Sequence, residues 1–167
     1  MTFFCHSISW GCLVPEIIVD ADACPVKDEV YKVARRYGLP VILVANSWLN
    51  HPGGKQIEMV VVETDRDSAD DEIARKATRS AIVITGDIPL AARCLDSGAR
   101  VLGHRGREFT QDNVVEALAT RHLLTQLRDR GTMLGGPQPF AKKDRSRFLQ
   151  KLDQLVNVMQ REEEADR

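Results

Sequence analysis

The chain has 167 residues and a mass of 18.7 kDa, a size that excludes a large multidomain enzyme and favours one domain with one core. Hydrophobic residues make up 43% of the chain and charged residues 28%, which disfavours the disordered and fibrous classes. The net charge of -1 provides no overall basic field, so any contact with a polyanion must come from a local patch.

The charges are unevenly distributed along the chain. Residues 1–99 hold 10 Lys/Arg and 14 Asp/Glu, a net charge of -4, whereas residues 100–149 hold 10 Lys/Arg and 5 Asp/Glu, a net charge of +5. This distribution predicts an acidic centre beside a basic rim. The alternative is a pair of ordinary solvated surfaces.

The four cysteines show no paired CxxC spacing, which fits a reduced, cytoplasmic protein. The first fifteen residues lack the charge pattern of a signal peptide, and no apolar run has the length of a membrane span. We therefore expect neither export nor membrane insertion, and we interpret residues 1–16 as an N-terminal extension.

From residue 17 onward, short apolar runs rich in β-branched residues alternate with amphipathic stretches. This alternation is typical of βαβ units around a parallel sheet. Strands are predicted at 17–20, 41–45, 58–62, 82–85 and 99–102. Helices are predicted at 25–37, 69–79, 89–97 and 111–130. We expect an α/β fold, a three-layer sandwich with a central, mainly parallel sheet.

The C-terminal part of the chain begins with a segment that neither a helix nor a strand can accommodate. Glycines and prolines interrupt residues 131–141, which predicts a loop. Helical periodicity returns at 142–161 and predicts a C-terminal helix. We expect residues 17–134 to form the α/β domain and residues 135–167 to pack on it as a loop and a helix.

Three acidic clusters fall where predicted strands end or predicted helices begin. They contain Asp20 and Asp22, then Asp67, Asp70 and Asp71, and finally Asp87. The carboxyl ends of parallel strands lie along one edge of a sheet, where ligands bind, so we expect these carboxylates to converge. Two unit charges about 4 Å apart repel by roughly 4 kcal/mol at an effective dielectric of about 20. Mg²⁺ or Mn²⁺ would offset this repulsion and could assist phosphoester hydrolysis.

Helix capping is the alternative explanation for these aspartates. The capping residues would be Asp22 or Cys24 before Pro25, Ser68 with Asp71, and Asp87 before Pro89. Capping does not explain why Asp20 lies at a strand end beside Asp22, or why Asp67 precedes the Asp70–Asp71 pair. Taken together, the clusters favour a site.

Five ordered segments resemble the bacterial YaiI/YqxD family. They are VDADACPVK at 19–27, DSADDEI at 67–73, VITGDIPLA at 83–91, GHRGREFTQDN at 103–113 and GGPQPFAKKDRSRF at 135–148. The resemblance covers about residues 17–160. This family is usually grouped with PIN-like domains, a fold that arranges acidic residues around Mg²⁺ or Mn²⁺ for nuclease activity.

The resemblance implies a PIN-like fold and roles for individual residues. Asp20 matches the first-strand aspartate, Asp70 or Asp71 the mid-chain acid, and Asp87 the acid of the T-x-D element. The implied metal ligands are Asp20, Asp22, Asp70, Asp71 and Asp87, and the implied catalytic residues are Asp20, Asp70 and Asp87. PIN domains have a fourth acid, for which this sequence offers only Glu108 or Asp112. The number of metal ions, one or two, therefore stays open.

Basic and polar residues beside the predicted strand ends are candidates for contact with a phosphate backbone. The candidate substrate-binding residues are Asn46, Thr85, His104, Arg105, Arg107, Lys143 and Arg145. RNA or another phosphodiester would be the substrate. A pair of solvated basic faces and a turn-forming Asn46 are the alternatives.

Two other functions fit the same residues. VDADA resembles the DxD signature of haloacid-dehalogenase phosphatases, although the order of the later acidic segments argues against that class. The other is a module that binds RNA through its arginines without cleaving it. The sequence does not separate a nuclease from such a module, and it leaves the oligomeric state open.

Overall fold

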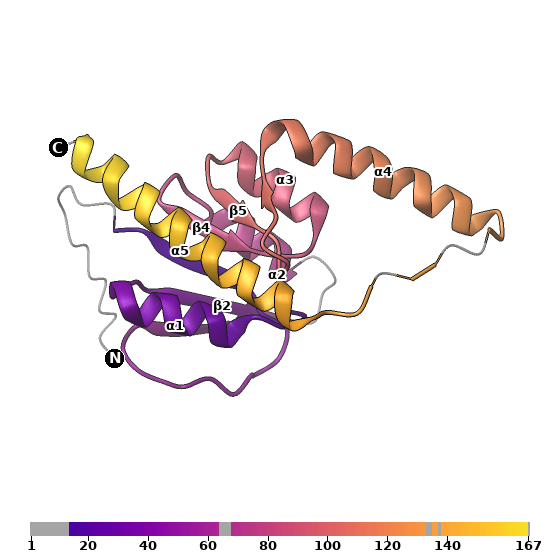
Figure 1. Ribbon diagram of the computed structural model, residues 1–167. Helices are drawn as coiled ribbons and strands as arrows, with labels where there is room; N and C mark the ends of the chain where they lie inside the picture. Colours follow the sequence, from indigo (N-terminus) through magenta and orange to yellow (C-terminus); the bar gives the residue numbers. More distant parts are fainter. Residues whose placement is uncertain (1–13, 64–67, 133–134, 137, 167) are drawn as a thin grey trace.

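A six-stranded sheet forms the centre of the computed structural model, which describes residues 14–63, 68–132, 135–136 and 138–166 (Figure 1). The strands are β1 (Glu16–Asp20), β2 (Val41–Ala45), β3 (Ile57–Val61), β4 (Ala81–Ile84), β5 (Arg100–Leu102) and β6 (Glu108–Phe109). Their order is β3-β2-β1-β4-β5-β6, and every neighbouring pair is parallel except β5 and β6. The mainly parallel sheet is therefore confirmed.

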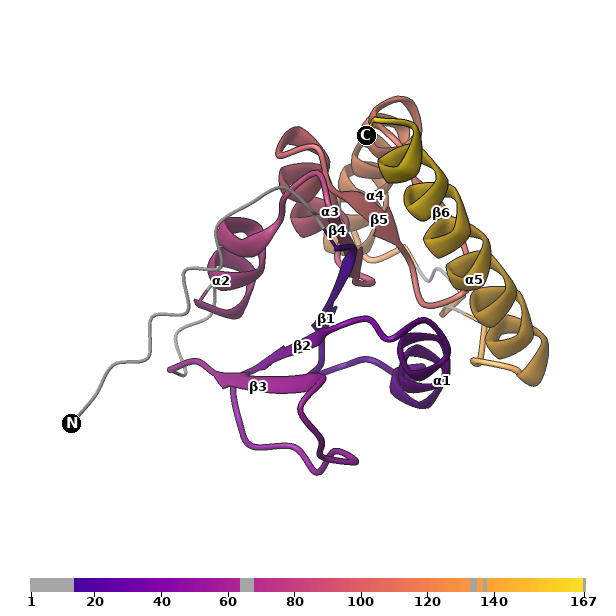
Figure 2. The ribbon, with the colours of Figure 1, turned by 90° about the vertical axis from the view of Figure 1, so that its left-hand side faces the viewer.

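Helices cover both faces of this sheet. They are α1 (Lys27–Tyr37), α2 (Ser68–Lys76), α3 (Ile88–Asp96), α4 (Gln111–Asp129) and α5 (Lys142–Ala165). Viewed along the sheet, α1 and α5 lie on one side of it and α2 and α3 on the other (Figure 2). This arrangement confirms the three-layer α/β sandwich with a C-terminal helix.

Alternating side chains of the strands fill two separate cores. In β1, Ile17 and Val19 belong to the core beneath α1 and α5, whereas Ile18 belongs to the core beneath α2 and α3. Because both faces are buried, the strands are apolar at nearly every position, as parallel sheets require. α5 contributes Phe148 and Leu152, both fully buried, to the first core.

Several predicted boundaries differ from the structure. The helix predicted to reach residue 79 ends at Lys76, and the helix predicted from Pro25 begins at Lys27. The two-residue strand β6 is missing from the sequence prediction, because a strand this short has no periodicity. Residues 1–13 of the predicted N-terminal extension, and Asp67, lie outside the described residues.

The second half of α4 extends away from the body of the molecule (Figure 1). Thr110 caps its first turn, Val114 belongs to the core on the α3 side of the sheet, and Ala117 is also buried. Farther along, Leu123 and Leu124 are 55% and 38% exposed. Among the residues that the structure describes, no helix has both the length and the apolar character needed to cross a membrane.

Gly106 lies in the turn between β5 and β6, where that turn touches α5. Its φ is +79°, and a Cβ added there would lie 2.9 Å from the carbonyl carbon, the oxygen and Cγ of Arg147. We expect Gly106→Ala to lower the free energy of unfolding by roughly 2–4 kcal/mol, because backbone strain and a steric clash add. Urea denaturation measures this loss.

Gly131→Ala is the matched control. Gly131 also has a φ of +79°, but an added Cβ would have no neighbour within 4 Å among the described residues. Only the strain of roughly 1–2 kcal/mol should remain in that variant. Equal losses in the two variants would show that Gly106 does not pack closely against α5.

Candidate functional site

The strand order reverses direction at the centre of the sheet, between β1 and β4. From β1 the chain passes through α1 to β2, on one side of the sheet, and from β4 it passes through α3 to β5, on the other. The two helices cover opposite faces, so their first turns diverge. In open α/β sheets, ligands bind at the carboxyl ends of the two strands that flank such a reversal.

Hydrogen bonds link the two strand ends at this position. Asp20, the last residue of β1, accepts a hydrogen bond of 2.9 Å from the buried hydroxyl of Thr85, directly after β4. The same hydroxyl accepts one of 3.0 Å from the backbone N–H of Asp87. Thr85 therefore fixes the positions of both acids relative to each other.

Asp87 has two roles in the structure. Its Oδ1 accepts a hydrogen bond of 3.0 Å from the N–H of Leu90, so Asp87 is the N-cap of α3, and the capping prediction is confirmed. Its Oδ2 lies 3.7 Å from a guanidinium nitrogen of Arg121 on α4. Capping thus occupies one oxygen and orients the other toward α4.

Asp22 and Asn46 form the third part of the edge. Both carboxylate oxygens of Asp22 accept a hydrogen bond from the backbone N–H of Asn46, at 3.2 and 3.0 Å. Lys27 Nζ donates to the carbonyl oxygen of Ala21 and holds the intervening loop. Val26 is the N-cap of α1, so the alternative that Asp22 caps this helix is wrong. The Asn46 Oδ1 atom is buried and has no hydrogen-bond partner in the described part of the chain.

The three acids interact electrostatically. Burial raises the pKa of the Asp20 carboxyl above its ordinary value, and the negative charges of Asp22 and Asp87 raise this pKa further. The hydrogen bond from Thr85 opposes the shift by stabilising the ionised form. In the protein without a bound cation, holding these ionised carboxylates together is therefore electrostatically unfavourable.

The donor chemistry of this edge fits a hard divalent cation, which prefers carboxylate and hydroxyl oxygens. Within the described ranges, no three Asp, Glu, His or Cys side chains are already arranged so that they could hold a metal ion. This arrangement is compatible with Mg²⁺, which is usually bound by one or two carboxylates together with water and substrate phosphates.

Asp70 and Asp71 lie in the first turn of α2, on the face of the sheet that α3 also covers. The Asp71 carboxylate forms an exposed ion pair of 2.7 Å with Arg93 of α3. The hydrogen bond that Arg93 donates to Asp71 raises the pKa of the Arg93 guanidinium, and the negative charges of Asp71 and Asp70 raise it further. Asp71 thus contacts α3, whereas the charges of Asp22 and Asp87 affect Asp20 at the strand ends.

His104 packs beneath the same edge. A Cβ added to Gly86, between Thr85 and Asp87, would lie 3.2 Å from the His104 Nδ1 and Cε1 atoms. The His104 Nε2 atom is buried and has no hydrogen-bond partner among the described residues. Burial lowers the pKa of the His104 imidazole, so the folded state favours the neutral ring.

This lowered pKa predicts a pH dependence of stability. Because the folded state binds the His104 proton less tightly than the unfolded state, His104 contributes stability above the unfolded pKa and loses it as pH falls through the folded pKa. The free energy of unfolding should therefore fall between pH 7 and pH 5, and fall less in His104→Gln. Urea denaturation at several pH values measures this, and parallel pH profiles would contradict it.

The predicted basic residues fall into two groups. Arg105 and Arg145 both lie over the Phe140 ring, at 5.8 and 5.2 Å. Arg105 pairs with the buried Asp144 at 3.1 Å. Arg145 donates to the Pro25 carbonyl at 2.7 Å and pairs with Glu29 at 3.2 Å. These two arginines thus join the start of α5 to the rest of the domain.

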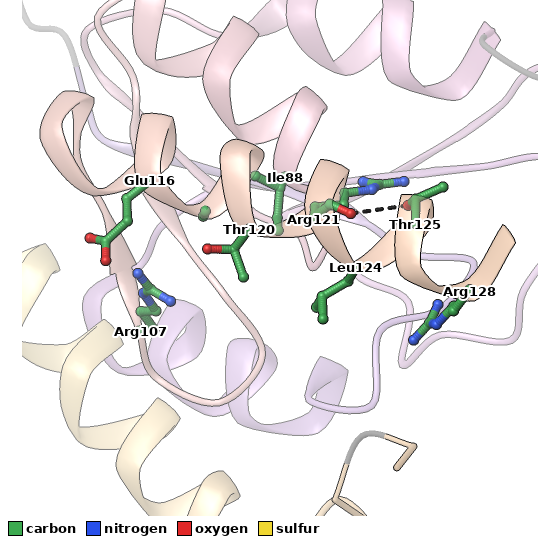
Figure 3. Close-up of a pocket in the computed structure, with 9 residues that line it drawn as sticks. Ile88, Arg107, Glu116, Thr120, Arg121, Leu124, Thr125 and Arg128 are labelled. Carbon is green, nitrogen blue, oxygen red and sulfur yellow. Dashed lines mark hydrogen bonds between the residues drawn. The ribbon is translucent and has the colours of Figure 1, made fainter. Parts of the chain in front are cut away.

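The second group remains available at the surface. Lys143 and Arg107 are exposed, and the Arg107 guanidinium lies 5.7 Å from the centre of the Phe109 ring. Arg107 also lines a groove of about 450 Å³ beside α4 (Figure 3). Arg121 and Arg128 line the same groove, and sequence reasoning missed both. Arginines spaced seven residues apart on one helix face were the available signal.

Comparisons with known proteins agree with one another. Residues 18–158 match the uncharacterised YaiI/YqxD family. A UPF0178 protein of Paramagnetospirillum magneticum is 53% identical over 146 residues, which cover 87% of this chain and 97% of the relative. UPF0178 proteins of Parvibaculum lavamentivorans and Rhodospirillum centenum are 54% and 51% identical, and the matches cover 87% of this chain and 96% and 97% of those proteins. No solved structure gives a significant match.

Proposed function

The chain belongs to the YaiI/YqxD family, and from the edge of its sheet we propose that it is a PIN-like phosphodiesterase that uses Mg²⁺ or Mn²⁺ to hydrolyse RNA or another phosphodiester. The observation that carries the proposal is the grouping of Asp20, Asp22 and Asp87 where the strand order reverses. Acids are kept together there although burial, and after it the charges of Asp22 and Asp87, raise the pKa of Asp20.

Asp20 and Asp87, which Thr85 links, would hold the cation together with water, with Asp22, Asp70 and Asp71 as further candidate ligands. A bound divalent ion supplies activation of water and stabilisation of the negative charge that develops on a phosphate. The Thr85 hydroxyl orients both acids, because it donates to the Asp20 carboxylate and accepts from the backbone N–H of Asp87. The neutral imidazole of His104 supports the Gly86 backbone between them.

A cleavage assay tests the proposal. Single-stranded RNA labelled at its 5′ end is incubated with the full chain in Mn²⁺, in Mg²⁺ and in EDTA. We expect cleavage that requires a divalent ion, is lost in Asp20→Asn and persists in Asp96→Asn, a control at the far end of α3.

Two results would contradict the proposed active site. Equal cleavage by wild type and Asp20→Asn would place the activity elsewhere, and no cleavage with either ion would favour the module that binds RNA without cutting it. A phosphorylated Asp20 trapped during turnover would instead support the haloacid-dehalogenase alternative.

A further inference from the structure

One face of α4 forms a wall of the groove, which Ile88, the residue after Asp87, also lines. Residues Ala117, Thr120, Arg121, Leu124 and Arg128 line it. Thr120 and Arg121 lie three and four residues after Ala117, and Leu124 and Arg128 continue at three- and four-residue spacings from Arg121, so these residues share one helix face. This face has the spacing of a core-facing stripe, yet from Thr120 onward it is open to solvent and carries two arginines.

The positive charges of the groove are arranged along its length. Arg121 and Arg128 are two helical turns apart, or about 10 Å along the axis of α4. Figure 3 shows Arg107 and Arg128 toward opposite ends of the groove, with Thr120 and Leu124 between them. The one acid among the lining residues, Glu116, lies on the Arg107 side, so the segment from Arg121 to Arg128 is the most basic.

The groove is continuous with the acid edge, which is formed by Asp20, Asp22 and Asp87 at the strand ends. Arg121 pairs with Asp87 at 3.7 Å, and Ile88, the next residue along the chain, lines the groove itself. A ligand lying in the groove would therefore reach the position where Asp20 and Asp87 meet.

We propose that this groove binds the phosphodiester backbone of a single-stranded nucleic acid whose chain continues to the Asp20–Asp87 edge. The role of that edge rests on the proposed function; the binding by Arg121 and Arg128 does not. Guanidinium groups form charge-assisted hydrogen bonds with phosphate oxygens. Ala117, Ile88 and Leu124 give the groove an apolar surface between the charges. Exposed bases of a single strand can cover such a surface, whereas a duplex stacks its bases inside.

Binding in EDTA tests the groove separately from catalysis. Fluorescence anisotropy measures the affinity of the full chain for single-stranded RNA, single-stranded DNA and a duplex over a range of salt concentrations. We expect Arg121→Gln and Arg128→Gln each to weaken single-strand binding roughly five- to tenfold. Each should also reduce the slope of log K against log salt by about 0.7, the value for one lost phosphate contact on a single strand.

Arg35→Gln is the matched control, because Arg35 is an exposed arginine on α1, which covers the opposite face of the sheet. It should leave affinity and salt slope unchanged, and circular dichroism should show all variants folded. The proposal is overturned if the wild type binds no single strand, if the duplex binds more tightly, or if Arg35→Gln weakens binding as much as Arg128→Gln.

The RNA and DNA arms show whether the 2′-hydroxyl contributes. Arginine-dependent binding together with no Mn²⁺ binding would support the groove and contradict the phosphodiesterase. Mn²⁺-dependent cleavage and single-strand binding that are both unchanged in Arg121→Gln and Arg128→Gln would support the phosphodiesterase and contradict the groove.

Discussion

Asp20→Asn is expected to abolish hydrolysis while leaving the folded protein as stable as the wild type or more stable. Loss of a ligand oxygen at the reacting phosphate should reduce the rate on the order of 10³-fold. The amide oxygen can still accept the hydrogen bond from Thr85, and the repulsion from Asp22 and Asp87 disappears. Cleavage assays and urea denaturation at pH 7 measure the two effects.

The stability of this variant should also depend differently on pH. Because the folded pKa of Asp20 is raised, the stability that Asp20 contributes is complete below the unfolded pKa and is lost as pH rises through the folded pKa. Asp20→Asn removes this loss, so its advantage over the wild type should grow from acidic to neutral pH.

Asp153→Asn is the control, because Asp153 is an acid stabilised by hydrogen-bond donors, whereas Asp20 lies beside other acids. Asp153 accepts hydrogen bonds from Arg36 at 2.7 Å and from Tyr37 at 2.9 Å. Its replacement should lower the free energy of unfolding by about 1 kcal/mol and leave hydrolysis unchanged. If Asp20→Asn destabilised the protein as Asp153→Asn does, Asp20 would stabilise the fold, and this result would contradict its proposed role in cation binding.

Phe148→Ala is expected to cost about 3–5 kcal/mol of unfolding free energy, because its ring is fully buried between α5 and the sheet. This residue follows a connection rich in glycine and proline, so the result tests whether the C-terminal helix belongs to the same folding unit. Urea denaturation should show one transition, shifted to lower urea.

Leu123→Ala provides the comparison, because Leu123 is 55% exposed on the extended half of α4. Leucine and alanine differ little in helix propensity, so the loss should stay within about 0.5 kcal/mol. Two separate transitions in Phe148→Ala, or a loss no larger than that of Leu123→Ala, would mean that α5 does not complete the core.

Elements with strong patterns were predictable from the sequence. Residues 41–45 carry five consecutive apolar residues, and β2 occupies that range. Helix ends were less accurate: Ala77 continues the apolar spacing of α2 after its last helical residue, Lys76. β6 depends on antiparallel pairing with β5 and not on a pattern of its own.

The candidate site was partly predictable for the same reason. Strand ends place Asp20 and Asp87 on one edge, and a parallel sheet brings them together wherever its strand order reverses. The roles of the arginines depend on distant partners. Arg145 pairs with Glu29, 116 residues away in the sequence, so its place in the α5 contact could not be separated from a role in substrate binding.

The position of Arg121 beside the acids could not be predicted from the sequence either. In the sequence Arg121 is one basic residue on a polar helix, and a solvated face is the ordinary interpretation. Only the packing of α4 against α3 brings the Arg121 guanidinium to 3.7 Å from the Asp87 carboxylate. The groove and the acid edge therefore become one continuous surface only in the folded structure.

Calorimetric titration with Mn²⁺ tests most directly whether the acid edge binds a divalent cation. It compares the wild type with Asp20→Asn, Asp87→Asn and the control Asp96→Asn, in the absence of nucleic acid. We expect saturable binding by the wild type and Asp96→Asn that is lost in Asp20→Asn and Asp87→Asn. No saturable binding at millimolar Mn²⁺, or binding that survives in Asp20→Asn, would contradict cation binding at the acid edge.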